Sequence, residues 1–539
     1  MINGKTQLFE ELRKKDLKLI SLKEASVWAS QYLNRKVTIS NISYLLQYGR
    51  INKYGDNGTT MVNEDELRDY YDSLNKEKGL KKALGEDLNW HLSFVEYTEA
   101  ERTKHVHRLH PYKGKFIPQL VEYFLDSHAD EFKKEVYFHK GDIVLDPFVG
   151  SGTTLVQANE LGIHGIGIDI SSFNSLITQV KVGRHNIELI SDVIKQLTVE
   201  LKKFEAAKNN IVFEEDLLIE LSKFNSRYFP SPEYKKQINK GKIDEERYGN
   251  EKEREFLNTY YSLTEKYGIK TRQENANTFL DKWLLPSVRE EVDFLSNKIK
   301  DLDNDDAKNV LMIILSRTVR SCRATTHADL ATLKEPVTTT YYCKKHGKIC
   351  KPIFSINKWW DFYAKDTLKR LKQFDNLRTD TFQISLTGDS RNIDIYEEVK
   401  KQTPGFAEKL LKQKIKGIFT SPPYVGVIDY HEQHAYAYEI FGFDRKDEFE
   451  IGPLSKGTGK EAKDSYARDI AEVLKNSKKY LQKGYDVFLV ANDKFNLYPK
   501  IAELAGMKIV NQFKRPVLNR VEKDRDTAYS ETIFHLKER

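Results

Sequence analysis

Short apolar runs separated by helical stretches dominate the pattern from residue 143 to the end of the chain. The strand-like runs are residues 143–145, 165–168, 415–419, 487–490, 508–513 and 532–536, and residues 154–161 and 466–481 have helical periodicity. Strands that alternate with helices predict an α/β fold with a Rossmann-like sheet.

The first 75 residues have a different pattern, that of a small separate module. Ser21 is a good N-cap for a predicted helix over residues 22–33, and a second predicted helix over residues 41–48 ends at Gly49. Two strand-like pieces, 50–54 and 59–62, flank the turn sequence GDNG. The order predicts a winged helix-turn-helix module that contacts DNA phosphates through Arg35, Lys36, Arg50 and Lys53. A protein-contact or dimerisation module of the same shape is the alternative.

The sequence DPFVGSGTT at residues 146–154 follows the first apolar run and leads into a helix. Its glycines allow a tight strand-to-helix turn and close approach of the backbone to a ligand. The second run ends at Asp169, a carboxylate placed where a ribose diol would bind. This pair predicts an adenosine-containing ligand. No lysine follows the glycines, so the pattern is not that of a loop that grips a triphosphate.

The sequence TSPPY at residues 420–424 ends the third apolar run. Pro422 and Pro423 have no N–H and restrict Ser421 to an extended conformation, so backbone carbonyls are left as rigid acceptors. The Ser421 hydroxyl and the Tyr424 ring would complete a pocket for a planar base with an exocyclic amine. An ordinary proline-stopped strand with a surface tyrosine is the alternative.

Taken together, DPFVGSGTT and TSPPY resemble the motifs of the DNA amino-methyltransferases, which use S-adenosylmethionine to methylate cytosine N4 or adenine N6. HPYKGKFIP at residues 110–118 and GDSR at 388–391 resemble two further segments of that family. The resemblance implies a Rossmann-like methyltransferase sheet with Ser421, Pro422, Pro423 and Tyr424 as catalytic residues. It also implies that the cofactor is bound by Lys115, Phe116, Asp146, Phe148, Gly150, Gly152, Thr153, Asp169 and Asp389.

In such a site the target base is flipped out of the duplex and stacks on Tyr424, and Ser421 and the Pro422 carbonyl accept the amine hydrogens. A serine before the proline pair is more typical of the cytosine-N4 branch, so we expect the product to be N4-methylcytosine in double-stranded DNA. The resemblance also implies a role in a restriction-modification or related defence system, with a cognate endonuclease as a possible partner. Adenine-N6 methylation, a non-catalytic DNA-binding regulator with this fold, and an RNA methyltransferase are the alternatives.

A long insert separates the second predicted strand from the third. We expect residues 105–174 and 386–539 to form the methyltransferase domain, 76–104 a connector, and 175–385 a helix-rich inserted domain that recognises the target. Within the insert, Arg320 and Arg323 end a predicted helix and are candidate DNA contacts. An amphipathic core helix with a solvated end is the alternative.

The three cysteines are too few for a disulfide framework, but Cys343, His346 and Cys350 have C-x2-H-x3-C spacing. A tetrahedral zinc site needs a fourth ligand, which Cys322 or His327 could supply. Because no clear second pair of ligands is present, we predict buried thiols and a surface histidine rather than a metal.

Composition adds a basic surplus to this picture. The 539 residues carry a net charge of +7 and are 39% hydrophobic and 12% aromatic, which suits a polyanionic partner whose bases can be stacked upon. No apolar run approaches the roughly 18 residues of a membrane span, and residues 1–15 lack a hydrophobic signal core. We therefore expect a cytoplasmic protein.

Overall fold

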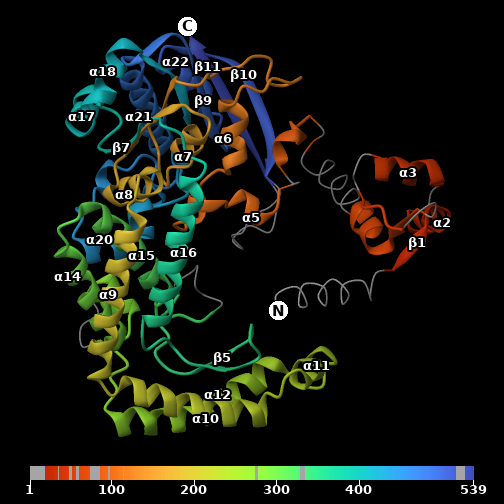
Figure 1. The fold of residues 1–539 in the computed structure, drawn as a ribbon, viewed down its shortest axis with the longest axis vertical. Helices are drawn as coiled ribbons and strands as arrows, with labels where there is room; N and C mark the ends of the chain where they lie inside the picture. The colour runs from red at the N-terminus through yellow and green to blue at the C-terminus, as the bar shows by residue number, and fades with distance from the viewer. Residues whose placement is uncertain are drawn as a thin grey trace. The chain divides into compact units, whose positions relative to one another are not determined.

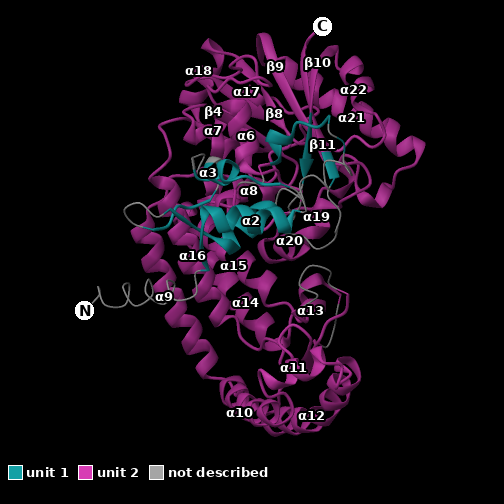
Figure 2. Cartoon of the chain, turned by 90° about the vertical axis from the view of Figure 1, so that its right-hand side faces the viewer, with its two compact units in different colours: residues 1–93, 514–530 teal, residues 94–513, 531–539 magenta. Residues whose placement is uncertain are grey.

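The computed structural model describes residues 18–33, 36–47, 51–55, 60–72, 85, 87–94, 97–112, 114–273, 277–327, 334–517 and 529–539. The chain divides into two compact units, residues 1–93 with 514–530 and residues 94–513 with 531–539 (Figure 2).

The first unit contains the helix, turn and helix that the sequence predicts. Helix α2 (Leu22–Tyr32) begins with a capping box in which Ser21 and Glu24 bind each other's backbone N–H groups, and α3 (Ile39–Gln47) follows. Strand β2 (Met61–Asn63) pairs antiparallel with β1 (Leu19–Ser21), and residues 64–72 are helical. Tyr54 and Met61 form a bridge at the base of the predicted wing, whose turn at 56–59 lies outside the described residues.

The second unit is built on a seven-stranded sheet in the order β10-β11-β9-β8-β3-β4-β7. Strands β7, β4, β3, β8 and β9 run parallel, and β11 is antiparallel to β9. All six strands predicted from the apolar runs are present, and β7 is a seventh strand that was not among them. Their bounds are β3 Ile143–Asp146, β4 His164–Asp169, β7 Gln383–Thr387, β8 Ile415–Thr420, β9 Leu481–Ala491, β10 Met507–Val517 and β11 Tyr529–Glu538.

Helices cover both faces of this sheet, so successive strand residues are buried on opposite sides. Ile143 and Leu145 of β3 face the helices α17 (Ile395–Gln402), α18 (Pro404–Lys412), α21 (Lys460–Lys478) and α22 (Tyr498–Leu504). On the other face lie α6 (Pro118–Leu125), α7 (Thr153–Glu160) and α8 (Ser172–Val182), where the Phe124 ring packs 5.6 Å from Phe419. Helix α21 begins at Lys460, six residues before the predicted start at Tyr466.

The segment between α8 and β7, which contains most of the predicted insert, is almost wholly helical. Its elements share one continuous hydrophobic core with α8 and with α20 (Ala435–Phe441), which follows β8. Figure 1 shows α10 and α12 side by side at the end of the insert that is farthest from the sheet. The elements are α9 Ile187–Ala206, α10 Asn210–Tyr228, α11 Glu233–Asn239, α12 Glu245–Tyr267, α13 Phe279–Trp283, α14 Pro286–Lys300, α15 Asp305–Ser321, β5 Tyr341–Cys343, β6 Lys348–Cys350 and α16 Asn357–Asp375.

Gly152 at the start of α7 has both a backbone and a steric reason to be glycine. Its φ is +77°, in the left-handed region, and an added Cβ would lie 2.8 Å from the Cγ2 and Oγ1 atoms of Thr178 on α8. Gly442 after α20 has a similar φ of +70° but nothing within 4 Å of an added Cβ. Alanine at Gly442 would therefore add backbone strain alone, whereas alanine at Gly152 would add both backbone strain and steric crowding.

We expect Gly442→Ala to lower the free energy of unfolding by roughly 1–2 kcal/mol, the cost of a left-handed non-glycine residue. Gly152→Ala should lose about 1–3 kcal/mol more, because the methyl group overpacks the contact with α8. Urea denaturation of both variants measures the difference. Equal losses of unfolding free energy in the two variants would show that the Thr178 side chain moves aside without an energetic penalty. Recovery of the unfolding free energy in Gly152→Ala/Thr178→Ala would locate the crowding at this contact.

Candidate active site

A pocket opens at the carboxyl ends of the parallel strands, where the strand order reverses between β3 and β8. Ligands bind at such switch points in open α/β sheets because the loops there diverge to opposite faces. The pocket encloses about 880 Å³ including its open mouth, within the range of small-ligand sites. Each strand end contributes to its lining: Gly150 after β3, Asp169 at the end of β4, Asp389 after β7 and Ser421 after β8.

The glycine loop between β3 and α7 is held from both sides. The Gly150 N–H donates to Oδ2 of Asp169 at 2.9 Å, while the Gly150 carbonyl accepts from Thr178 at 3.2 Å. The Ser151 carbonyl accepts from Nζ of Lys181, a fully buried side chain of α8. Because the N–H of a trans peptide is antiparallel to its carbonyl, the Ser151 N–H points away from Thr178 and α8.

Asp169 is enclosed and almost fully engaged with the backbone. Besides the Gly150 bond, its Oδ1 accepts from the Ser171 N–H at 2.9 Å and from Nδ2 of Asn174 at 3.1 Å. Burial raises the pKa of this carboxyl, and these hydrogen bonds oppose the rise. Oδ2 is left with room for one further donor from the pocket, such as a ligand hydroxyl.

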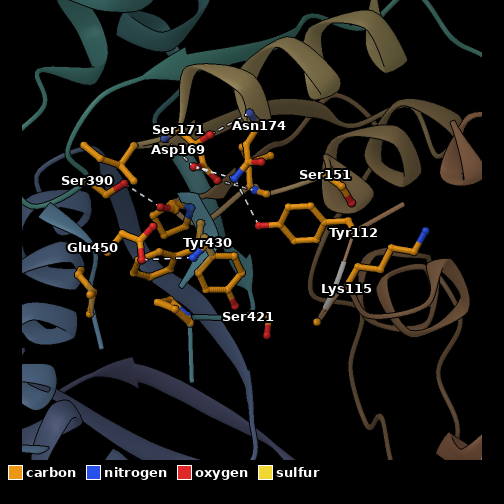
Figure 3. Close-up of a pocket in the computed structure, with 18 of the residues that line it drawn as sticks. Tyr112, Lys115, Ser151, Asp169, Ser171, Asn174, Ser390, Ser421, Tyr430 and Glu450 are labelled. Carbon is orange, nitrogen blue, oxygen red and sulfur yellow. Dashed lines mark hydrogen bonds between the residues drawn. The ribbon is translucent and has the colours of Figure 1, made fainter. Parts of the chain in front are cut away.

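Aromatic and polar side chains that sequence reasoning missed line the wall beside Asp169 (Figure 3). The rings of Tyr112 and Tyr430 are stacked with centroids 6.1 Å apart, and Asn174 donates to the Tyr112 hydroxyl at 3.3 Å. Glu450 accepts the N–H groups of Tyr430 and His431 and also binds the His431 ring. Tyr112 belongs to the HPYKGKFIP segment, but the segment after β8 carries no comparable spacing signal.

Ser421 lies at the pocket edge with its hydroxyl hydrogen already engaged. Its Oγ donates to the Val490 carbonyl at the end of β9, at 3.1 Å, which leaves the oxygen lone pairs as acceptors. Pro423 also lines the pocket. Pro422 is buried, and the half-buried Tyr424 directs its hydroxyl to Oε1 of Glu531 at 3.2 Å, so neither side chain is part of this lining.

The other predicted cofactor residues divide into those that line the pocket and those that support it. Lys115 lines it but sends its ammonium to the His107 carbonyl at 2.8 Å, and both carboxylate oxygens of Asp389 are bound by the guanidinium of Arg391. Asp146 and Gly152 lie outside the lining, and Gly152 instead packs against α8. The remaining pocket residues of the prediction are Phe116, Phe148 and Thr153.

Asp146 is buried beneath the glycine loop. Its Oδ1 accepts from Oγ1 of Thr420 at 2.5 Å and from the Phe148 N–H at 3.1 Å, so it joins the end of β3 to the end of β8. Burial raises the pKa of this carboxyl to about 6. Asp146 therefore acts through the geometry of the strand ends rather than through direct contact with the pocket.

The predicted DNA contacts have different surroundings. Lys36 and Lys53 are exposed in the first unit, and Arg35 and Arg50 lie outside the described residues. Arg320 is half-buried at the end of α15, whereas Arg323 is 6% exposed and donates from Nε to the Arg320 carbonyl at 2.8 Å. Burial lowers the pKa of Arg323 to about 10. Arg323 is thus a core residue rather than an exposed cation for phosphate.

A glycine-loop pocket above this strand order, with Ser-Pro-Pro-Tyr after β8, defines the class of methyltransferases that modify exocyclic amines. The profile N6_N4_Mtase, described as DNA methylase, matches residues 35–180. The type II methyltransferase M.MjaII of Methanocaldococcus jannaschii is 48% identical over 529 residues, which cover 96% of this chain and 97% of that protein. The chain belongs to the N6/N4 DNA methylase family, as the sequence motifs predicted, and is a DNA methyltransferase.

Other similarities are more limited. M.BsoBI, a type II methyltransferase of Geobacillus stearothermophilus, is 28% identical over 235 residues, 40% of this chain and 44% of that protein. The solved rRNA methyltransferase aviRa of Streptomyces viridochromogenes covers 82% of this chain and 94% of its own, but with a TM-score of 0.28 and 9% identity, values too low to bear on substrate. Among the described residues, no helix has both the length and the apolar character to cross a membrane.

The buried Asp146 carboxyl should make the stability of the folded chain depend on pH. Its pKa is raised from 3.8 to about 6 in the folded chain, so its contribution to stability is present below about pH 4 and is lost as the pH rises through about 6. Asp146→Asn does not titrate. The stability of the parent relative to this variant should therefore fall by roughly 2–2.5 kcal/mol between pH 4 and pH 7. Urea denaturation of both proteins across this range measures it, and a pH-independent difference would contradict the assignment.

Proposed function

We propose that this enzyme transfers a methyl group from S-adenosylmethionine to N4 of cytosine in a specific double-stranded DNA site, as the modification enzyme of a restriction-modification system with a cognate endonuclease. The observation that carries the proposal is the Ser421 hydroxyl. Its hydrogen is committed to Val490 and its lone pairs are left for an amine at the edge of a pocket of cofactor size.

The residues of the pocket suit the cofactor. Asp169 offers a carboxylate oxygen to the ribose hydroxyls, and the stacked Tyr112 and Tyr430 rings supply an apolar wall beside it. The loop N–H groups before α7 favour a carboxylate at the methionine end. Asp389 stands where the adenine amine is expected, although that amine would have to share the carboxylate with Arg391. When bound, the cofactor supplies an electrophilic methyl group on a sulfonium.

The protein residues must activate the exocyclic amine of the target base, a poor nucleophile, for attack on the methyl group. The lone pair of an exocyclic amine is delocalised into its ring, and acceptors placed beside the amine hydrogens favour a pyramidal nitrogen whose lone pair is available. Ser421 and the Pro422 carbonyl take this role in the proposal. Tyr424 stacks on the base after it has been flipped out of the duplex.

Support for cytosine over adenine comes from Ser421. A serine before the proline pair is more typical of the cytosine-N4 branch, whereas its oriented hydroxyl, as an acceptor, suits the amine of either base. Adenine N6 offers an amine of similar geometry and is the alternative product.

The first unit and the insert are proposed to hold the DNA. In the first unit α3 would enter the major groove, with Lys36 and Lys53 on phosphates together with Arg35 and Arg50. In the insert, Arg320 at the end of α15 remains a candidate contact. Phosphate contacts add affinity without sequence information, so base recognition is assigned to the insert.

Two substitutions should separate cofactor binding from catalysis. Ser421→Ala removes an acceptor that acts most strongly in the transition state, so we expect turnover to fall by on the order of a hundredfold or more while cofactor affinity stays unchanged. Asp169→Ala should instead abolish most cofactor binding. Calorimetry with S-adenosylmethionine and single-turnover methylation of duplex DNA give the two readouts.

Mass spectrometry of nucleosides from DNA methylated by the parent identifies the product. N4-methylcytosine is expected, and N6-methyladenine alone would overturn the base assignment but leave the mechanism standing. Turnover of Ser421→Ala within a few-fold of the parent would remove Ser421 from the mechanism. Cofactor binding without methylation of any DNA would favour a non-catalytic regulator.

The salt dependence of DNA binding tests the first unit. Each lysine–phosphate contact contributes about 0.9 to the slope of log affinity against log salt concentration, so Lys36→Ala/Lys53→Ala should flatten the slope by roughly 2. Lys23→Ala, which changes another exposed lysine of the first unit on α2, serves as the control and should leave the slope unchanged. If the double variant keeps the parental slope, these two lysines do not contact phosphates.

A further inference from the structure

Four potential metal ligands converge beside the β5–β6 hairpin of the insert. One ligand atom from each of His327, Cys343, His346 and Cys350 lies within 4.8 Å of all the others. Nδ1 of His346 is 3.6 Å from Sγ of Cys343 and 3.4 Å from Sγ of Cys350, and Nδ1 of His327 is 3.6 Å from Sγ of Cys343. The fourth ligand that the sequence left open is thus His327.

These separations match the edges of a zinc tetrahedron. With zinc–sulfur bonds of about 2.3 Å and zinc–nitrogen bonds of about 2.0–2.1 Å at tetrahedral angles, sulfur and nitrogen atoms stand about 3.6 Å apart. Two cysteines and two histidines form one of the common structural zinc sets. Because S–H···N hydrogen bonds have similar lengths, the observation that favours a shared cation is the convergence of all four ligand atoms within 4.8 Å of one another.

The fold brings the ligands from two segments of the insert. Cys343 and Cys350 belong to the two strands of the hairpin, His346 to its turn with Gly347 at φ +60°, and His327 to the segment after α15. Cys322 is buried in the core at the end of α15 and is outside the cluster.

The hairpin itself is docked on the helical arm of the insert. Asn225 of α10 exchanges two hydrogen bonds with the backbone of Ile349, and Glu253 of α12 accepts from the Tyr342 N–H at 2.8 Å. A cation held by the four side chains would therefore link the end of α15 to the arm formed by α10 and α12.

The chemistry of the groups suits a cation that replaces protons. Imidazole nitrogens and cysteine thiolates are among the ligands that zinc prefers. Each thiol would release one proton to solvent, and two thiolates balance the charge of Zn²⁺.

The surroundings allow entry and permit coordination. His327 and His346 are exposed while both thiols are buried, which gives a cation a path from solvent to the sulfur atoms. The Tyr341 hydroxyl lies 2.8 Å from Nδ1 of His327, and a bound cation would replace this hydrogen bond.

We propose that His327, Cys343, His346 and Cys350 bind one structural zinc ion that staples the segment after α15 to the β5–β6 hairpin. Because the four protein ligands fill the coordination sphere, the ion has no open position for substrate or water. The inference is independent of which base the enzyme methylates.

Metal analysis of the full-length chain, purified under reducing conditions without added chelator, tests the proposal. We expect one zinc per chain by plasma mass spectrometry, and release of that zinc when a mercurial reagent titrates the thiols. Cys343→Ser and His346→Asn should each lose most of the zinc. Cys322→Ser, a buried cysteine outside the cluster, is the matched control and should keep it.

Cobalt exchange into the parent protein provides a second measurement that does not depend on whether the variants fold. Four-coordinate Co²⁺ with two thiolates should give sulfur-to-cobalt charge-transfer bands and intense visible bands. Folded parent protein with no stoichiometric metal, a Cys343–Cys350 disulfide found by mass spectrometry, or loss of zinc from Cys322→Ser equal to that from Cys343→Ser would each overturn the proposal.

Discussion

The hydrogen bond from the Gly150 N–H to the Asp169 carboxylate joins the ends of β3 and β4, and the pocket depends on it. It fixes the glycine loop in a left-handed turn over the sheet, with Asp169 below it. A second carboxylate, Asp146, ties the end of β3 to Thr420 at the end of β8, one residue before Ser421. Burying two acids on adjacent strands is costly, and the N–H and hydroxyl donors around them compensate. The parts of the pocket proposed to bind the cofactor and the target base are thus fixed relative to each other.

Much of this architecture could be predicted because it follows from local rules. Apolar runs that end in Asp146, Asp169 and Thr420 mark the strands whose carboxyl ends meet, and glycines between a strand and a helix mark the loop. The wall formed by Tyr430, His431 and Glu450 could not be predicted. Tyr430 and His431 begin the short helix α19 (Tyr430–Gln433), and Glu450 joins them from farther along the chain by accepting their N–H groups, so no spacing in the sequence reveals them.

In the insert, too, the sequence pattern could not predict which side chains are buried. A helix that ends in Arg320 and Arg323 has the same sequence pattern whether its last turn is solvated or enclosed, and only the packing of α15 against its neighbours shows that Arg323 is buried. Cys322 and His327 were equivalent candidates for a fourth ligand. The continuation of α15 to Ser321 places Cys322 in the core, while His327 lies beyond the helix where the chain can reach the hairpin.

On the proposed reaction, the neutral acceptors around the amine also bear on the fate of its proton. A nitrogen that has accepted a methyl cation is positively charged and conjugated to an electron-poor ring, which makes it a strong acid. It can lose its proton to a weak base or to water, so no carboxylate general base is required beside it. The Ser421 hydroxyl, oriented by the Val490 carbonyl, is then sufficient for catalysis, because its role is to localise the lone pair of the amine nitrogen before attack. The charge created at the nitrogen disappears with the proton, and the methylated base leaves as a neutral product.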